Sequence, residues 1–221
     1  MAKSKSKKDE EIQREIENIK EQKRDAITAL RKDQITRAAY RVVSERGYYN
    51  FTIQDIARAA GLSTGLIHHY FKDKETLLVN LLKEMQRNIG TYLQETLERS
   101  VEPLAKLEIF IDQAFRIIER EKDFMYVLFD FWTQIKFNER MRNLMQKLYN
   151  SYRDVCSSII REGKEAGVFG DIDDQFFATV IISLIQGTIE QYLIDRNTFN
   201  YRSYSNTVKG LIIGMMQRDL K

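Results

Sequence analysis

Apolar residues recur every three or four positions along most of this chain, which is the period of an amphipathic α-helix. No stretch keeps the strict alternation that is typical of a half-buried strand. Strong helix formers are abundant, and proline occurs once, at Pro103. The pattern predicts an all-α fold in three parts: an N-terminal lead-in (1–30), a trihelical unit (31–80) and a helical bundle (81–221).

The lead-in itself divides in two. Residues 1–8 carry four lysines and two serines, which predicts a disordered basic arm; such an arm can enter a minor groove but is more often solvated. From Asp9 to Leu30 the sequence is helix-like, with heptad-like apolar positions at Ile12, Ile16, Ile19, Ala26 and Leu30. Because Lys23 interrupts this seam, we expect a long, partly exposed helix leading into the next one rather than a coiled coil.

Three short helices and the start of a fourth are predicted next. The first has the apolar face Ile35, Ala38, Ala39, Val42 and Val43, and it stops at Gly47. Thr52 is the expected N-cap of the second helix, which Gly61 ends, and Ser63 caps the third. Asp73 then caps a helix that extends to about Arg99.

Longer helices are predicted after Pro103, with breaks at polar and glycine-containing segments. Their expected ranges are 104–121, 124–135, 138–165, 173–195 and 202–219. The segment 173–195 is apolar almost all round, so it must be buried inside this unit or against a second subunit.

Charge and cysteine content narrow the class of protein. The net charge is +3, but residues 31–74 hold eight basic against four acidic residues, as expected of a segment that meets a phosphate backbone. Cys156 is the only cysteine, which fits a reducing cytoplasm. No apolar segment follows the N-terminal lysines, and the longest apolar run, 176–189, is too short to cross a bilayer. We therefore expect a cytoplasmic protein without membrane association.

The stretch from Thr52 to Phe71 has the spacing of a helix-turn-helix. Counting from Ile53, a small residue (Ala57) stands at position five, where two helices cross closely. Gly61 stands at position nine, where a tight turn needs a positive φ, and Ile67 at position fifteen, where the second helix is buried. The second helix would then present its first turn to the major groove.

The wider segment, from Ile35 to Leu78, resembles the DNA-binding domain of TetR-family repressors. The shared positions are Ala39, Gly47, Tyr48, Thr52, Ile56, Ala57, Ala60, Gly61, Ser63, Gly65, Tyr70, Phe71, Lys74 and Leu77. Two features depart from the family pattern: His68 stands where the family usually has an aromatic residue, and the lead-in is longer than usual. The resemblance implies a transcriptional regulator with a C-terminal domain for effector binding and dimerisation.

The resemblance also implies which residues touch the operator. Helix starts favour phosphate, which points to Thr52 and Ser63, and Lys74 is expected to contact the phosphate backbone. The residues expected to read bases or phosphates on the recognition helix are Thr64, Gly65, His68 and His69, with the hydroxyl of Tyr70 as a further phosphate donor.

Structural explanations compete with some of these roles. Ser63 can be a plain N-cap, and Tyr70 and Phe71 can be core residues. Adjacent histidines on a helix diverge by about 100° and cannot chelate one ion together, so no metal site or cofactor is expected. No G-x-S-x-G motif or Gly-rich phosphate loop is present, and both histidines belong to the recognition helix, so an enzyme is not expected.

For the C-terminal bundle the sequence predicts a homodimer, with the segments 173–195 and 202–219 pairing across the interface. Aromatic residues in its middle suggest an apolar cavity with a few polar anchors. The candidate pocket residues are Phe110, Gln113, Phe129, Trp132, Gln134, Tyr152, Gln186 and Glu190. Glu190 lies in an apolar helix, so it meets a cationic ligand or an arginine, or turns outward; the sequence does not decide among these.

Two hypotheses of function follow. In the first, a homodimer represses transcription at a palindromic, double-stranded operator until an apolar small molecule releases it. In the second, the protein is a DNA-bound adaptor without ligand sensing that recruits a protein partner, and its C-terminal core would be filled.

Overall fold

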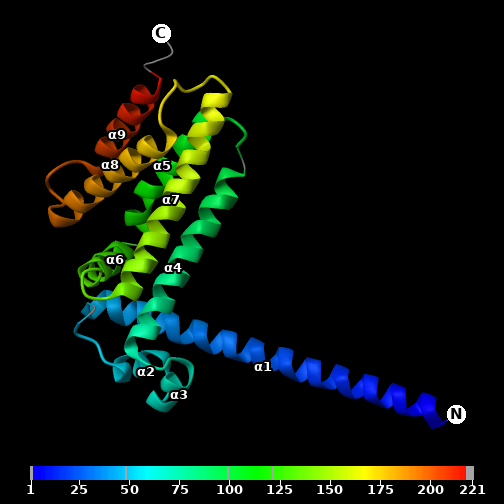
Figure 1. Cartoon of the computed structure of the whole chain (residues 1–221). Coiled ribbons are helices and arrows are strands. Elements are labelled where there is room, and N and C mark those ends of the chain that lie inside the picture. Colours follow the sequence, from blue (N-terminus) through cyan, green and yellow to red (C-terminus); the bar gives the residue numbers. More distant parts are fainter. Residues whose placement is uncertain (1, 48, 99, 121, 218–221) are drawn as a thin grey trace. The chain divides into compact units, whose positions relative to one another are not determined.

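The computed structural model describes the chain except residues 1, 48, 99, 121 and 218–221 (Figure 1). Tyr48, one of the positions shared with the TetR family, lies outside the described residues. The described part forms two compact units, residues 1–81 and 82–221. It contains helices and no strand: α1 (Ala2–Arg46), α2 (Ile53–Ala60), α3 (Thr64–Tyr70), α4 (Lys74–Leu97), α5 (Pro103–Arg120), α6 (Lys122–Gln134), α7 (Glu139–Glu165), α8 (Asp174–Ile194) and α9 (Tyr201–Met216). The all-α prediction is confirmed, and the predicted boundaries after Pro103 lie within about three residues of those observed.

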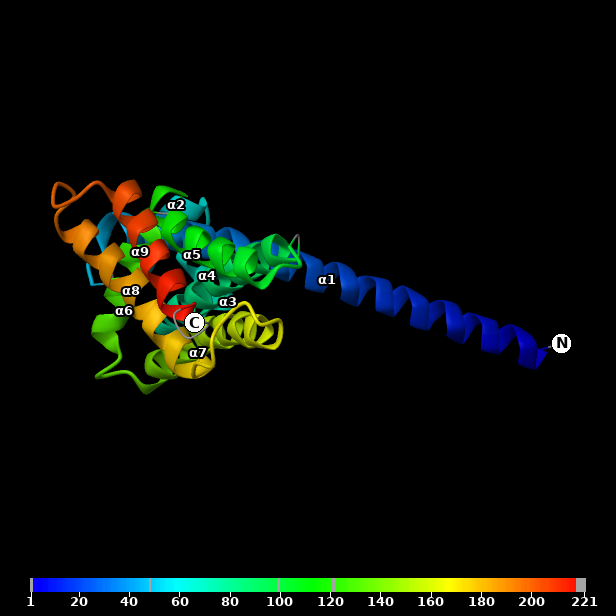
Figure 2. The same cartoon turned by 90° about the horizontal axis from the view of Figure 1, so that it is seen from above.

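The N-terminal arm is where the sequence-based prediction was wrong. Residues 2–8 are the first turns of α1 and not an irregular arm, and α1 continues without a break through the predicted lead-in to Arg46 (Figures 1 and 2). The physical reason is local. No glycine or proline interrupts the segment, and Lys7 stands four residues before Glu11, a spacing that supports a helix.

The first unit buries one face of the last third of α1 against α2 and α3. The apolar side chains on this face are those predicted, and Gly47 then ends α1 with a positive φ of 76°. The fully or almost fully buried residues of the unit include Ile35, Ala38, Ala39 and Val43 of α1, Ile56 of α2, Ile67 of α3, and Phe71, Leu77 and Leu78.

Polar side chains of α1 satisfy the free carbonyl groups at the end of α2. Gln34 Nε2 donates to the Ala60 carbonyl over 2.8 Å, and Arg41 Nη2 donates to the Ala59 carbonyl over 3.1 Å. The last carbonyls of a helix have no partner within the helix. These two bonds therefore fix the end of α2, where the turn begins, against α1.

In the second unit, α5 packs against α6, α7, α8 and α9, and α7 packs against α8. Gly163 of α7 lies against the ring of Phe169, and no side chain would fit in its place. At the far end of the sequence, the hydroxyl of Tyr201 donates to the Phe115 carbonyl over 2.8 Å and so joins α9 to α5.

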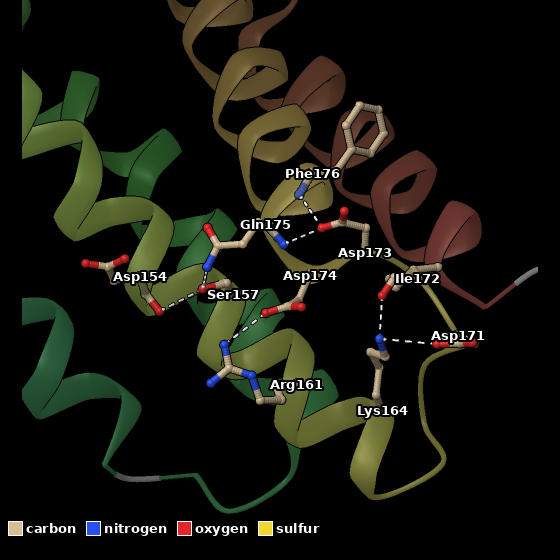
Figure 3. A network of polar contacts seen from close by, with 10 residues as sticks. All are labelled: Asp154, Ser157, Arg161, Lys164, Asp171, Ile172, Asp173, Asp174, Gln175 and Phe176. Carbon is tan, nitrogen blue, oxygen red and sulfur yellow. Dashed lines mark hydrogen bonds and ion pairs between the residues drawn. The ribbon is translucent and has the colours of Figure 1, made fainter.

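A polar network fastens the beginning of α8 to α7 (Figure 3). Asp173 caps α8 by accepting from the amides of Gln175 and Phe176, at 3.0 and 2.9 Å. Arg161 Nη2 of α7 lies 2.9 Å from Asp174 Oδ2, and this hydrogen bond lowers the pKa of Asp174. The network orients α8, whose 21 residues contribute to the core of the unit.

Helix α8 is also long and apolar enough to cross a membrane on length and composition alone, a criterion that core helices of soluble proteins also meet. The most apolar run within it, residues 176–189, is too short to cross a bilayer, but the whole helix is longer than this run. Its inner side is buried in the unit through Ala178, Ile181, Ile185 and Ile189, and its outer side is exposed.

Candidate functional site

The helix-turn-helix begins with a capping box at Thr52. Thr52 Oγ1 accepts from the Asp55 amide over 3.2 Å, while the Thr52 amide and hydroxyl both donate to Asp55 Oδ2, at 2.9 and 2.7 Å. This arrangement confirms Thr52 as an N-cap and occupies both of its donors. Thr52 as a phosphate contact stays a prediction, and its donors would have to be shared.

Asp55 adds a negative charge to the same helix start. Its hydrogen bonds with Thr52, and then the nearby Arg46 and Arg58 guanidinium groups, lower the pKa of this carboxyl group. The N-terminus of α2 therefore already has an anion beside it. The first turn of α3 contains no acidic residue, so the phosphate contact predicted at Ser63, which stays a prediction, would have no carboxylate in that turn to oppose it.

The turn between α2 and α3 has the geometry that the spacing predicted. Gly61 has φ 66° and ψ 34°, in the left-handed region that favours glycine. The amide of Leu62 donates to the Ala57 carbonyl over 2.9 Å and closes the turn. Ala57 and Ile67 are buried, which places α3 directly across α2.

Helix α3 separates buried from exposed residues sharply. Ile67 and Phe71 are fully buried, whereas Ser63, Thr64, Gly65, His68 and His69 are exposed. Ser63 Oγ accepts from the Leu66 amide over 3.2 Å, so its capping role is confirmed. Tyr70 is half-buried, with its ring edge-on to that of His69 at 5.0 Å. The predicted readers thus lie on the accessible side of α3.

Lys74 has a structural role that the sequence did not reveal. Its Nζ donates to the Phe51 carbonyl over 3.2 Å and lies 3.8 Å from the centre of the Phe51 ring. Partial burial lowers the pKa of this ammonium group. The phosphate contact predicted for Lys74 is untested, and the side chain also holds the loop before α2 against the start of α4.

Two exposed basic residues near the motif were not predicted as contacts. Lys72 lies in the loop between α3 and α4, and Arg58 is 76% exposed on α2. The sequence shows that both residues are basic, but it does not show that their side chains are exposed next to the recognition helix. Both extend the set of candidate phosphate contacts.

In the second unit, aromatic residues of α6 and α7 form a connected series, here called the aromatic cluster: Phe129, Trp132, Tyr149 and Tyr152. Successive ring centres are 6.0, 6.0 and 6.4 Å apart. Burial raises the pKa of both tyrosines. The sequence predicted three members of the cluster and missed Tyr149, although Tyr149 stands three residues before Tyr152 and so shares its face of α7.

Glu190 of α8 adds a carboxylate to the aromatic cluster. It lies close enough to Tyr149 to raise the pKa of that phenol further, after the larger effect of burial. Glu190 is half-buried and has no hydrogen bond or ion pair with any described residue. The sequence left three possibilities open for Glu190: a cationic ligand, an arginine or an outward orientation. Among the described residues, no arginine pairs with it.

Three further predicted pocket residues, Phe110, Gln113 and Gln186, have no described ring contact or hydrogen bond with the aromatic cluster. Phe110 is buried on α5, and Gln113 and Gln186 are half-buried on α5 and α8. Gln134 is buried and donates to Thr133 Oγ1 over 2.8 Å. Their roles in ligand binding stay predictions. Among the described residues, no three metal-ligating side chains come together.

Comparisons with known proteins give one family match in each of the two units. Residues 35–81 match the family "Bacterial regulatory proteins, tetR family", and residues 103–212 match "BetI-type transcriptional repressor, C-terminal". The fatty acid metabolism regulator protein of Bacillus subtilis is 26% identical over 184 residues, which cover 81% of this chain and 92% of that protein.

Two solved structures with bound ligands are similar over most of their length. The regulator FadR from B. subtilis, in complex with stearoyl-CoA, has a TM-score of 0.71 and 25% identity, over 81% of this chain and 96% of that one. A putative regulator from Saccharomonospora viridis, in complex with choline, has a TM-score of 0.77 and 25% identity, over 82% and 94%. This chain belongs to the TetR family of transcriptional regulators, which are DNA-binding proteins and not enzymes.

Proposed function

We propose that this protein is a homodimeric repressor that leaves a palindromic operator when a small molecule binds its second unit. The observation that carries the DNA-binding half is the exposed side of α3, where Thr64, Gly65, His68 and His69 are accessible while Ile67 anchors the helix. Base readout in the major groove requires a helix that is anchored on one face and carries exposed side chains on the other.

A homodimer is supported by the outer surfaces of α8 and α9. Phe176, Leu184 and Ile194 of α8 and Leu211 of α9 are 60%, 38%, 80% and 59% exposed, which is costly for apolar side chains in water. Gly210 and Gly214 on α9 have open space where a Cβ would be, so a second helix can approach closely. A dimer also supplies the two readers that a palindromic site needs.

The aromatic cluster with Glu190 is the proposed effector site. Similar regulators of known structure bind stearoyl-CoA or choline, so a ligand with a long apolar chain and a small cationic ligand both occur. Here, a half-buried carboxylate without a described partner stands beside electron-rich rings, and both features attract an organic cation. The proposed effector is an apolar molecule with a positively charged group.

Release from the operator requires that the effector bind one conformation of the dimer more tightly than the other. The proposed conformations differ in how far apart the two α3 helices of the dimer stand. A spacing that no longer matches one turn of DNA prevents both helices from entering the major groove together. Because the operator lies on the chromosome, the proposed location is cytoplasmic.

The test begins with selection of bound sequences from randomised duplexes, followed by fluorescence anisotropy on the selected site. We expect a two-fold symmetric site, with binding weakened in Thr64→Ala. Only weak, sequence-independent binding with a steep salt dependence would overturn the operator half of the proposal.

The effector half is tested on the same duplex with compounds that share an eight-carbon chain and differ in the head group. Octyltrimethylammonium should release the duplex, octanoate and octanoyl-CoA should not, and Glu190→Gln should abolish the discrimination. Release by none of the compounds, or equal release by all three, would overturn the cationic effector.

A further inference from the structure

The first two-thirds of α1 present an apolar seam that none of the described residues covers. Ile16, Ile19 and Leu30 are 39%, 57% and 69% exposed. Every described side chain from residue 13 to 33 is exposed, except the half-buried Thr28. The side-chain hydrogen bonds described within residues 13–32 join only neighbours on α1, such as Gln22 with Asn18. Both views show this part of the helix without another element of its unit beside it (Figures 1 and 2).

The seam is separate from the face of α1 that packs on α2 and α3. Burial begins at Ile35, five residues after Leu30 and therefore about 140° further around the helix. The exposed isoleucines are thus not the fringe of the trihelical core. These apolar side chains can be buried only against a surface that the trihelical unit does not provide.

The spacing of the seam is that of a two-stranded coiled coil. Ile16, Lys23 and Leu30 are seven residues apart and take heptad positions a, while Ile19 and Ala26 take positions d. The positions away from the seam, b, c and f, are all polar: Arg14, Glu17, Asn18, Glu21, Arg24, Asp25, Thr28, Arg31 and Lys32. On sequence alone Lys23 argued against a coiled coil, but a two-stranded coil tolerates a polar residue at one a position, at some cost in stability. The exposure of the whole seam is what reverses that expectation.

The charges on this part of α1 favour a second copy of the same helix as the partner, in parallel orientation. Residues 13–33 hold six basic and five acidic side chains, so this part of α1 is nearly neutral and lacks the excess of positive charge that favours a phosphate backbone. In a parallel pair of the same helix, Glu15 at position g faces Lys20 of the second copy at position e, and the reverse pair forms by symmetry. An antiparallel pair centred on the seam brings the two Lys20 residues together instead.

We infer that α1 pairs with α1 of a second copy of this chain, as a parallel two-stranded coiled coil over about residues 12–30. The pairing is a separate interface from the α8–α9 contact proposed above and does not depend on it. The pairing also accounts for the length of α1. A long helix in water is stabilised mainly by packing of its apolar face, and the second copy would supply that packing.

Cysteine cross-linking in the full chain tests the pairing. Cys156 is fully buried, and burial raises the pKa of its thiol to about 12, so an introduced cysteine is the only reactive one. Ala26→Cys places a thiol at position d, where the two helices face each other. Glu21→Cys places one at position f, on the opposite side of the same exposed helix.

In a glutathione redox buffer, Ala26→Cys should form a covalent dimer at least tenfold faster than Glu21→Cys, and the unmodified chain should form none. Equal rates, or no dimer from Ala26→Cys in a protein with unchanged circular dichroism, would overturn the inference. A partner of another kind, protein or DNA, would give the latter result.

A second pair of variants strengthens the seam instead of probing it. Lys23→Ile, combined with Ala26→Cys, should raise the cross-linking rate severalfold because it completes the apolar seam. Arg24→Ile is the matched control, with the same side chain at an outward position, and should leave the rate unchanged. Equal acceleration by both would indicate non-specific aggregation and overturn the inference.

Discussion

Arg46 Nη1 lies 2.9 Å from Asp55 Oδ1, so the last residue of α1 is tied to the first turn of α2. The other oxygen of Asp55 closes the capping box with Thr52. One carboxylate therefore connects the end of α1 to the start of the helix-turn-helix: it forms an ion pair with Arg46 and accepts the hydrogen bonds of the capping box from Thr52.

This carboxylate predicts a dependence of stability on pH. Its pKa is lowered in the folded protein, so its stabilising contribution is present above the unfolded value near 3.8 and is lost as the pH falls through the folded value. Asp55→Asn should lower the melting temperature at pH 7, and the difference from the wild type should shrink below about pH 4. Asp25→Asn, on the exposed part of α1, should change neither. A difference that stays constant with pH would contradict the prediction.

Thr64 and Lys74 should differ in what they contribute to DNA binding. Thr64 is exposed, so Thr64→Ala should cost about 1–3 kcal/mol in binding to the selected site, alter the preference at one base and leave the melting temperature unchanged. Lys74→Ala should weaken binding to all sequences, reduce the salt slope by about one and lower the melting temperature, because the bond to Phe51 is lost. Anisotropy over a salt series and thermal unfolding together test both; a melting temperature lowered by Thr64→Ala would refute its assignment as a reader.

Gly163 predicts a packing defect in the second unit. A Cβ at this position would overlap the Phe169 ring, and the Val168 amide, next to that residue, donates to the Gly163 carbonyl over 2.8 Å. Gly163→Ala should lower the free energy of unfolding by about 1–3 kcal/mol in chemical denaturation. Gly90→Ala is the control: it is exposed on α4 with open space around it, and should be stabilising by roughly 0.5–1 kcal/mol. Equal effects of the two would show that Phe169 moves aside freely.

Trp132 provides a direct readout of the proposed effector site, since it is the only tryptophan in the chain. Its ring lies 6.0 Å, centre to centre, from the rings of Phe129 and Tyr149. A compound that releases the operator should therefore shift or quench tryptophan emission at the same concentration that causes release. A compound that releases DNA without changing the emission would place the effector site elsewhere.

Local chemistry made much of the DNA-binding unit predictable. Thr52, Ser63 and Asp73 were recognisable as N-caps because each binds an amide three residues ahead, a relationship that sequence spacing contains. Gly61 was recognisable because its positive φ is costly for other residues. The continuous α1 was misjudged at its N-terminus because the lysine-rich composition was given more weight than the absence of any helix breaker.

What the sequence by itself determined are the helices, their caps and the spacing of the helix-turn-helix, because these depend on residues within about four positions of one another. Only the tertiary structure decided which distant side chains meet. It brought Tyr149 between Trp132 and Tyr152, tied Lys74 to Phe51, and left the seam of α1 uncovered. The physical reason is that contacts between helices depend on how whole faces pack, and many residues determine that packing together.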